Sequence, residues 1–213
     1  MEKITLCQTP LFRGMTEDEI ETTLHVLSAV ERRYQKGEVV LRAGEPSERM
    51  GLVLSGGVTI ESCDPWGKRT LLSHVGPGQL FAESYALLQN EPMQVDVCVS
   101  EDCRILFLSP AGLQCTEPWA AKATRNLLAI TARKNLTLSL RSFHTAPKTV
   151  RERVTAYLNT EALRRRKREF DIPFDRQQLA DYLNLDRTAL SKELGKMRAD
   201  GLIEYRKSHF VLK

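Results

Sequence analysis

Residues 175–194, with the sequence DRQQLADYLNLDRTALSKEL, contain two helix-start signals close together. Asp175 is a favourable N-cap residue, and Gln178 three positions later completes a capping-box pattern. Asp186 provides an N-cap for a second helix, and Leu183-Asn184-Leu185 between them predicts a turn. The stretch therefore predicts two short helices joined by a tight turn.

The second helix is expected to bury Leu190, Leu194 and Met197. It is expected to end at Gly201, because glycine adopts the left-handed conformation of a helix C-terminus at little cost. Residues 202–212 form two short apolar runs around a polar turn, which predicts a β-hairpin. A helix-turn-helix followed by such a wing is typical of DNA-binding domains.

The exposed face of the second helix carries two cations and two small hydroxyls: Arg187, Thr188, Ser191 and Lys192. Side chains of this kind can enter the major groove and meet base edges and phosphates. Arg176, at the start of the first helix, is expected to touch a backbone phosphate. These five residues are the predicted DNA-binding site, and the alternative is a helical hairpin with an accidental basic face.

The net charge is divided unevenly along the chain. Residues 1–147 carry a net charge of −2 and residues 148–213 carry +6, which together give the total of +4. A basic run, Arg164-Arg165-Arg166-Lys167-Arg168, ends a predicted helix at residues 149–168. Its expected buried side chains are Val150, Val154, Leu158 and Leu163. This distribution indicates a sensing or assembly part followed by a part that binds a polyanion.

The N-terminal part has a different pattern. Thr16 and Glu19 form a capping-box signal for a first helix. Residues 33–108 then contain apolar runs of four to six residues, separated by turns such as Ser55-Gly56-Gly57 and Gly76-Pro77-Gly78. Many short strands between glycine and proline turns predict an antiparallel sandwich or jelly roll.

A long helix is predicted after Pro118, since no helix breaker follows until Pro147. Its apolar positions cover more than half of its circumference, so we expect it to pack on the roll and also on a second copy of itself. Charged residues at Leu127 and Ile130 are expected to give monomers. The alternative is a helix buried within one chain. Residues 143–147 are expected to break the helix as a hinge.

The predicted fold class is therefore α+β. It comprises a double-stranded β-helix (jelly roll) at residues 1–117, a dimerisation helix and hinge at 118–146, and a winged helix-turn-helix domain at 147–213. The longest apolar runs are too short to span a bilayer, and the N-terminal residues lack the pattern of a secretory signal. The five cysteines are scattered and odd in number, which favours a reducing, cytoplasmic location without a disulfide framework.

From about residue 6 to residue 213 the chain resembles the cAMP receptor protein/FNR family of bacterial transcription regulators. The roll matches through Lys36-Gly37-Glu38 and residues 52–58, and the cyclic-nucleotide-binding cassette through residues 81–88 and 92–97. The C-terminal part matches through residues 178–180 and 186–192. The resemblance implies a homodimer, a palindromic DNA operator, a small-molecule effector, and RNA polymerase as a partner if the protein is an activator.

The cassette departs from the pattern of family members that bind cAMP. They have glycine where this chain has Ala82, and an arginine followed by a small residue where this chain has Met93-Gln94. That arginine pairs with the cyclic phosphate, which Met93 cannot do, and Asp96 adds a negative charge. In the recognition helix, Thr188 and Lys192 replace a glutamate and an arginine of the cAMP receptor protein, so a different DNA half-site is expected.

The effector pocket is expected where the cassette meets the long helix near Leu138. Its predicted lining is Phe81, Ala82, Glu83, Ser84, Tyr85, Met93 and Gln94. These side chains suit a neutral or aromatic molecule better than a phosphate. Two alternatives remain open, which are a regulator that responds to a cyclic nucleotide and a constitutive regulator whose roll is empty.

An enzyme is not expected. Jelly-roll enzymes of the cupin type hold a metal with a His/Glu cluster, whereas His25, His74, His144 and His209 lie in four separate segments. An iron–sulfur cluster needs several nearby cysteines, but only Cys7 is close to the N-terminus. Cys63, Cys98 and Cys103 are expected to be small core residues. The sequence thus predicts no metal, no cofactor and no membrane partner.

Overall fold

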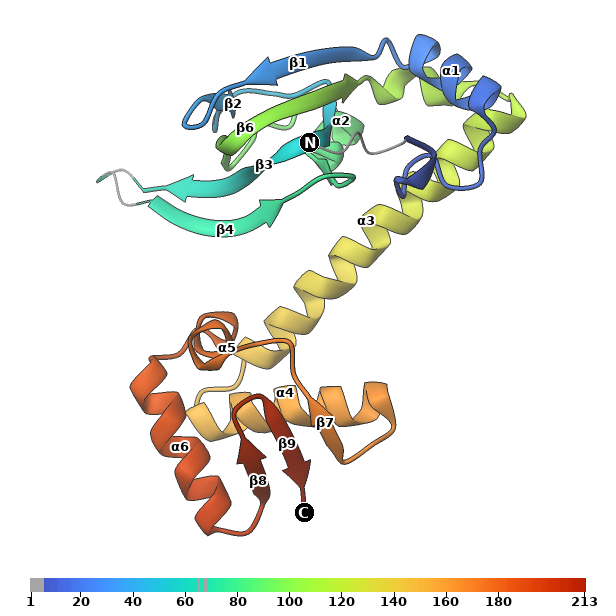
Figure 1. Cartoon of the computed structure of the whole chain (residues 1–213). Coiled ribbons are helices and arrows are strands. Elements are labelled where there is room, and N and C mark those ends of the chain that lie inside the picture. The colour runs from blue at the N-terminus through green and yellow to red at the C-terminus, as the bar shows by residue number, and fades with distance from the viewer. Residues whose placement is uncertain (1–5, 65, 67–68) are drawn as a thin grey trace. The chain divides into compact units, whose positions relative to one another are not determined.

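The computed structural model describes residues 6–64, 66 and 69–213. The chain folds into two compact units, residues 1–132 and residues 133–213. The long helix α3 (Pro118–Thr145) contributes its first turns to one unit and its last turns to the other (Figure 1). The sequence-based division at residues 117 and 146 stays a prediction.

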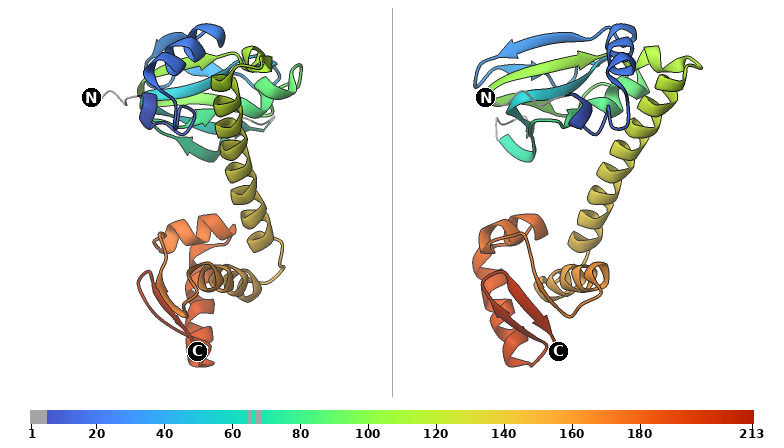
Figure 2. Two further views of the ribbon diagram at one scale, coloured as in Figure 1. Left: turned by 90° about the vertical axis from the view of Figure 1, so that its right-hand side faces the viewer. Right: turned by 45° about the vertical axis from the view of Figure 1, so that its right-hand side comes forward.

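The first unit contains a sheet of six strands in which every pairing is antiparallel. The main path runs β1 (Val30–Tyr34), β6 (Asp96–Leu108), β3 (Met50–Cys63) and β4 (Arg69–Val75). β2 (Val39–Leu41) pairs with β6, and β5 (Leu80–Phe81) pairs with β3. Figure 2 shows the strands curling around their own interior, as in the predicted jelly roll.

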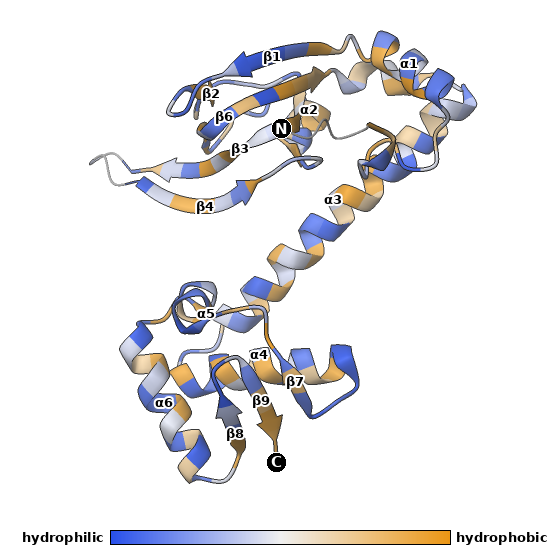
Figure 3. Cartoon of the chain, viewed as in Figure 1, coloured by the Kyte–Doolittle hydropathy of each residue, from blue (hydrophilic) through white to orange (hydrophobic). Residues whose placement is uncertain are grey.

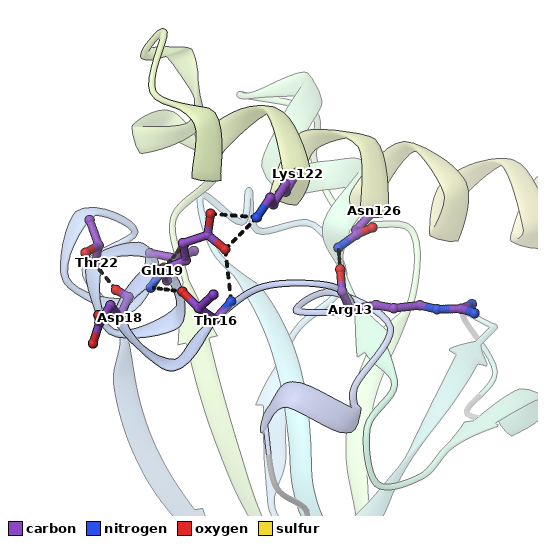
Figure 4. Close-up of polar contacts among 8 residues, drawn as sticks. Arg13, Thr16, Asp18, Glu19, Thr22, Lys122 and Asn126 are labelled. Atoms are coloured by element: carbon purple, nitrogen blue, oxygen red, sulfur yellow. Dashed lines mark hydrogen bonds and ion pairs between the residues drawn. The ribbon is translucent and has the colours of Figure 1, made fainter.

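Short helices cover one end of the roll. They are η1 (Leu6–Gln8), α1 (Glu17–Val26), α2 (Glu83–Leu88), η2 (Pro110–Gln114) and the first turns of α3. The predicted capping box is present at α1, where Thr16 and Glu19 exchange side-chain and backbone hydrogen bonds. Lys122 of α3 donates to both carboxylate oxygens of Glu19 at 2.7 Å (Figure 4). Asn126 donates to the carbonyl of Arg13 at 2.9 Å, so α3 is tied to the N-terminal segment at two points.

One predicted turn in the roll is wrong. Residues 51–55 and 57–61 were expected to be two strands joined at Ser55-Gly56-Gly57, but they form the single strand β3. Its pairing with β6 shifts register between Ser55 and Val58, so the glycines mark an irregularity within a strand. Gly56 has a φ of +74°, and a Cβ there would lie 2.2 Å from the carbonyl oxygen of Asp102. The glycine therefore permits a close backbone approach instead of a turn.

The helix α3 corrects two expectations. It continues through Thr145, so the break predicted from Phe143 begins three residues later. His144 is therefore a buried residue of the last helical turn. Leu127 is only 3% exposed because it packs in the core of its own roll, and Ile130 packs against the same core. The double substitution at these two positions would therefore damage the roll, and it is not a test of dimerisation.

The second unit packs three helices on a small sheet. Its elements are α4 (Val150–Arg165), β7 (Glu169–Asp171), α5 (Arg176–Leu183), α6 (Arg187–Ala199), β8 (Ile203–Arg206) and β9 (His209–Leu212). The sheet order is β7-β9-β8 with antiparallel pairing, and β7 was not predicted. The expected helix-turn-helix and wing are confirmed.

The end of α4 also differs from expectation. The helix stops at Arg165, three residues early, because Arg166 adopts a left-handed conformation that caps it. Leu163 was expected to be buried but is 79% exposed, since it faces away from the core against which its neighbour Ala162 packs. In the described part of the chain, no helix is both long and apolar enough to cross a membrane.

Candidate functional site

The helix α6 presents a polar face fixed by its buried side. Leu190, Leu194 and Met197 are buried in the core of the second unit, as expected. The Asp186 side chain accepts a hydrogen bond from the Ala189 amide at 2.8 Å and starts the helix. The side chains on the outer face are exposed, namely Arg187, Thr188, Ser191 and Lys192. Four of the five predicted DNA-binding residues therefore lie on one accessible surface.

The turn before α6 is held in place from α4. Asn184 ends α5 with a left-handed φ of 54°, and Leu183 beside it is buried. Arg153 of α4 donates to the carbonyl of Leu183 at 3.3 Å and to that of Asn184 at 3.0 Å. It thereby satisfies carbonyl groups that the end of a helix leaves without partners. The sequence analysis missed this role, which no local signal marks.

Two carboxylates, Glu193 of α6 and Asp200 directly after it, are paired with a cation of α4. Arg151 of α4 pairs with Glu193 and, at 2.8 Å, with Asp200. These hydrogen bonds raise the pKa of Arg151, with the bond to Glu193 as the largest cause. In the residues that the structure describes, neither of these two carboxylates forms an ion pair with Arg187 or Lys192.

Arg176, the fifth predicted residue, is half-buried at the start of α5. Its guanidinium carbon lies 5.2 Å from the centre of the Tyr205 ring on the wing strand β8. Burial lowers the pKa of Arg176, Tyr205 opposes that change, and the nearby charge of Arg187 lowers the pKa further. Arg198 lies 5.4 Å from the same ring. The sequence analysis missed both residues, because Arg198 lies near the C-terminal end of α6, beyond the predicted recognition face, and Tyr205 lies on the wing.

The cassette residues lie on β5, α2 and the segment before β6. Phe81 and Glu83 are buried, Ala82 and Tyr85 are half-buried, and Ser84 is exposed. Ala82 has a left-handed φ of 58° at the start of α2. The hydroxyl oxygen of Tyr85 accepts a hydrogen bond from the backbone amide of the exposed Gln94 at 3.3 Å, which links α2 to the following segment.

Met93 is a core residue of the roll and only 3% exposed. It belongs to the same apolar cluster as Phe81, and its backbone pairs with that of Gly44 and Glu45. Asp96 accepts a hydrogen bond from the Ala43 amide at 2.8 Å, so this carboxylate holds a loop. Leu138 lies in the other unit and is exposed, and its part in an effector pocket stays a prediction.

The cysteines divide into two groups. Cys98 and Cys103 are buried, as expected, and burial raises the pKa of the Cys103 thiol to about 11. Cys63 is exposed and not a core residue, because it is the last residue of β3. Across residues 6–64, 66 and 69–213, no three His, Cys, Asp or Glu side chains cluster as metal ligands.

Two family models match the chain in separate segments. The cyclic nucleotide-binding domain matches residues 31–114, and the Crp-like helix-turn-helix domain matches residues 152–213. The cyclic AMP receptor protein of Thermus thermophilus is 30% identical over 142 residues, which cover 65% of this chain and 64% of that protein. The alignment thus spans slightly less than two thirds of this relative.

Solved structures share the fold. The catabolite activator protein of Thermus thermophilus aligns over 96% of this chain and 94% of its own, with a TM-score of 0.54 and 25% identity. CprK complexed with OCPA aligns over 92% of this chain and 91% of its own, with a TM-score of 0.63 and 14% identity. These likenesses extend over both units.

Proposed function

The chain belongs to the cAMP receptor protein/FNR family, and from this premise we propose that it is a homodimeric, sequence-specific DNA-binding regulator of transcription. We propose further that its roll responds to a small effector other than cAMP. We propose a palindromic operator as its DNA site, and RNA polymerase as a partner if the protein activates transcription.

The exposed face of α6 carries the proposal of DNA binding. Arg187, Thr188, Ser191 and Lys192 project from a helix whose opposite side is locked in the core. Arginine and lysine recognise guanine and phosphates, and small hydroxyls adapt to several base edges. The net charge of +6 on residues 148–213 favours attraction to the DNA backbone.

The exposed side of α3 supports the proposal of a homodimer. Leu128 and Leu136 are 66% and 65% exposed, and Leu140 and Phe143 continue the same line of the helix with Ala132 between them. Figure 3 shows hydrophobic segments recurring along this helix. Leu127, about 100° around the helix from Leu128, packs on the roll, so this exposed line is left to meet a second copy. A dimer with twofold symmetry would read a palindromic operator.

The cassette argues against cAMP as the effector. Residues 81–95 contain no lysine or arginine and include two glutamates, so a cyclic phosphate would find no cationic partner there. Met93, which replaces the expected arginine, is packed in the core. A neutral or aromatic effector fits this lining better. The burial of Met93 also favours a second candidate, a constitutive regulator whose roll is only a scaffold.

DNA binding is tested by selecting bound sequences from a random duplex library and measuring Kd for a selected site and for scrambled DNA. Arg187→Ala should lose discrimination between the two by about 1–3 kcal/mol, because it removes a contact with base edges. Arg176→Ala should weaken both about equally, because phosphates carry no sequence information. Absence of any enriched sequence, or equal losses of discrimination in both variants, would contradict the proposed roles.

The effector proposal is tested by thermal melting with cAMP and cGMP. We expect no increase in Tm with either nucleotide, since a ligand raises Tm only when it binds the native state. A clear increase with micromolar cAMP, abolished in Glu83→Ala, would mean that the cassette accepts a cyclic nucleotide. DNA binding by ligand-free protein that is unchanged by any metabolite would favour the constitutive candidate.

A further inference from the structure

The ring of Tyr205 brings together two arginines from two different helices. Arg176 of α5 lies 5.2 Å and Arg198 of α6 lies 5.4 Å from the ring centre. The ring itself is stacked on Phe210 with centroids 5.8 Å apart, and Phe210 is fully buried. The core of the second unit therefore fixes the ring, and the ring in turn restrains both guanidinium groups.

The charges gathered at this ring lack carboxylate partners. No ion pair involves Arg176, Arg187 or Arg198 in the described part of the chain. Glu193 and Asp200 pair with Arg151, and Glu204 pairs with Lys213 at 2.7 Å. Asp175 and Asp186, which precede Arg176 and Arg187, accept backbone hydrogen bonds as N-caps. The charge of Arg187 also acts on Arg176, which links the ring to the recognition face of α6. Like charges held close together are relieved by an anion.

We propose that Tyr205 is a positioning residue that holds Arg176 and Arg198 as a pair for the phosphate backbone of DNA bound by α6. This inference rests on the proposed DNA binding and adds two residues, Tyr205 and Arg198, to that surface. The ring acts through the arginines and not by touching a base.

The physical reason is pre-organisation. A free arginine side chain loses rotamer freedom when it is fixed on a phosphate, and an aromatic ring that restrains it beforehand reduces that cost. A leucine at position 205 would fill much of the same volume but offers no negative ring face to a cation. Phenylalanine keeps the ring face and lacks only the hydroxyl. Comparing Tyr205→Leu with Tyr205→Phe therefore separates the effect of the aromatic ring face from the effect of filling the same volume.

The experiment uses the full chain and a fluorescent duplex of random sequence, about 30 base pairs long, which needs no knowledge of the operator. Anisotropy titrations at about 50 to 200 mM KCl give Kd and its salt dependence. Tyr205→Leu should raise Kd about threefold to tenfold, in line with the loss of two moderate cation–π contacts. The salt slope should fall by about one to two phosphate contacts, at roughly 0.9 per contact. Tyr205→Phe should restore both quantities nearly to those of the original protein.

Arg198→Gln leaves the ring in place and tests the pair without disturbing Phe210. It should raise Kd about threefold and reduce the salt slope by about 0.9, and adding it to Tyr205→Leu should give less than the product of the two effects. Arg69→Gln, at an exposed position on β4, removes the same charge from the first unit and is the matched control. Melting curves establish that each variant folds.

The outcomes separate this inference from the proposal on which it rests. If the unaltered protein binds neither random nor selected DNA, the proposed function fails and this inference fails with it. If the protein binds DNA but Tyr205→Leu keeps the original Kd and salt slope, only the positioning role is overturned. If the leucine variant does not fold, the same result in Arg198→Gln overturns it. An equal loss in Tyr205→Phe and Tyr205→Leu would also overturn it, because the ring face would then not matter.

Discussion

Ala82, the N-cap residue directly before the cassette helix α2, occupies a backbone conformation that favours glycine. Its φ is 58°, which costs an L-residue with a side chain about 1–2 kcal/mol relative to glycine. Its methyl group is half-buried and packs against the apolar cluster that contains Phe81 and Met93. The strain is thus offset in part by packing, which explains how alanine is accommodated at this position.

Ala82→Gly should change the free energy of unfolding by less than about 0.5 kcal/mol, because relief of strain offsets the lost methyl group and the added chain entropy. Ala86→Gly, inside α2 and buried in a normal helical conformation, should lower the free energy of unfolding by roughly 1–2 kcal/mol. Chemical denaturation of both variants makes the comparison. Equal destabilisation would mean that Ala82 is not strained.

His144 lies in the last turn of α3, inside the segment expected to be a hinge. It is buried, with Nδ1 3.0 Å from the Tyr182 hydroxyl and Nε2 2.9 Å from the Thr160 hydroxyl. Because the Thr160 hydroxyl donates to the Ala156 carbonyl, it accepts from Nε2–H, and Nδ1 of a neutral ring accepts from Tyr182. Burial lowers the pKa of His144, and the charge of Glu161 opposes that change. The end of α3 is therefore fastened to α4 and α5 by a neutral imidazole.

This fastening should make stability depend on pH. Above about pH 6.5 the imidazole is neutral in both states. As the pH falls below that value, the unfolded chain takes up a proton that the folded chain resists, so the free energy of unfolding decreases. Denaturation at about pH 7 and pH 5.5 should show this decrease, and His144→Gln should be less stable at pH 7 and less sensitive to pH. The other histidines are present in both proteins, so the difference in pH dependence between the original protein and His144→Gln reports His144 alone. If the variant kept the pH dependence of the original protein, His144 would not be the group responsible.

At the scale of elements, α4 determines the charge that α6 presents. Arg151 reaches from the start of α4 to Glu193 and to Asp200 at the end of α6. The same pairs hold the two helices together. A single arginine thus joins the two helices and also neutralises two carboxylates of the segment that carries the exposed basic face.

Arg151→Gln should lower the Tm by roughly a few degrees and weaken binding to random-sequence DNA, because both carboxylates are released. The salt slope should stay the same, since we expect Arg151, paired with Glu193 and Asp200, to make no phosphate contact. Lys148→Gln, an exposed charge just before α4, is the matched control and should show a smaller loss of both quantities. A loss of DNA binding with an unchanged Tm would instead place Arg151 on the DNA.

At the scale of the whole molecule, the exposed line of α3 predicts the oligomeric state. Leu128→Glu together with Leu136→Glu should give folded monomers, because apolar area at about 25 cal/mol per Å² would no longer be buried between copies. Leu127→Glu should instead lower the Tm of the roll, since that side chain is in its core. Analytical ultracentrifugation and melting curves distinguish the two effects.

Thr137→Glu is the control for this experiment. Thr137 is exposed on the same helix, about half a turn around from Leu128, so an added charge there should leave the dimer intact. A dimer that persists in the Leu128/Leu136 variant would place the interface outside this line. Monomers in the original protein would refute the proposed dimer.

The sequence by itself determined the helices of the second unit and the chemistry of the face that α6 exposes. Capping signals at Thr16, Asp175 and Asp186 act over three residues, and the period of Leu190, Leu194 and Met197 sets which face of α6 is exposed. These are local interactions, so a reading of neighbouring residues suffices. The five predicted DNA-binding residues followed from them.

Only the tertiary structure decided which apolar side chains are covered. Leu127 and Leu128 are adjacent and equally apolar, yet the first is buried in the roll and the second is exposed. The same holds for the burial of Met93 and the exposure of Leu163. Burial depends on elements far away in the sequence, which no local pattern reveals. The approach of Arg176 and Arg198 to Tyr205 has the same origin, because three separate elements must fold before these side chains meet.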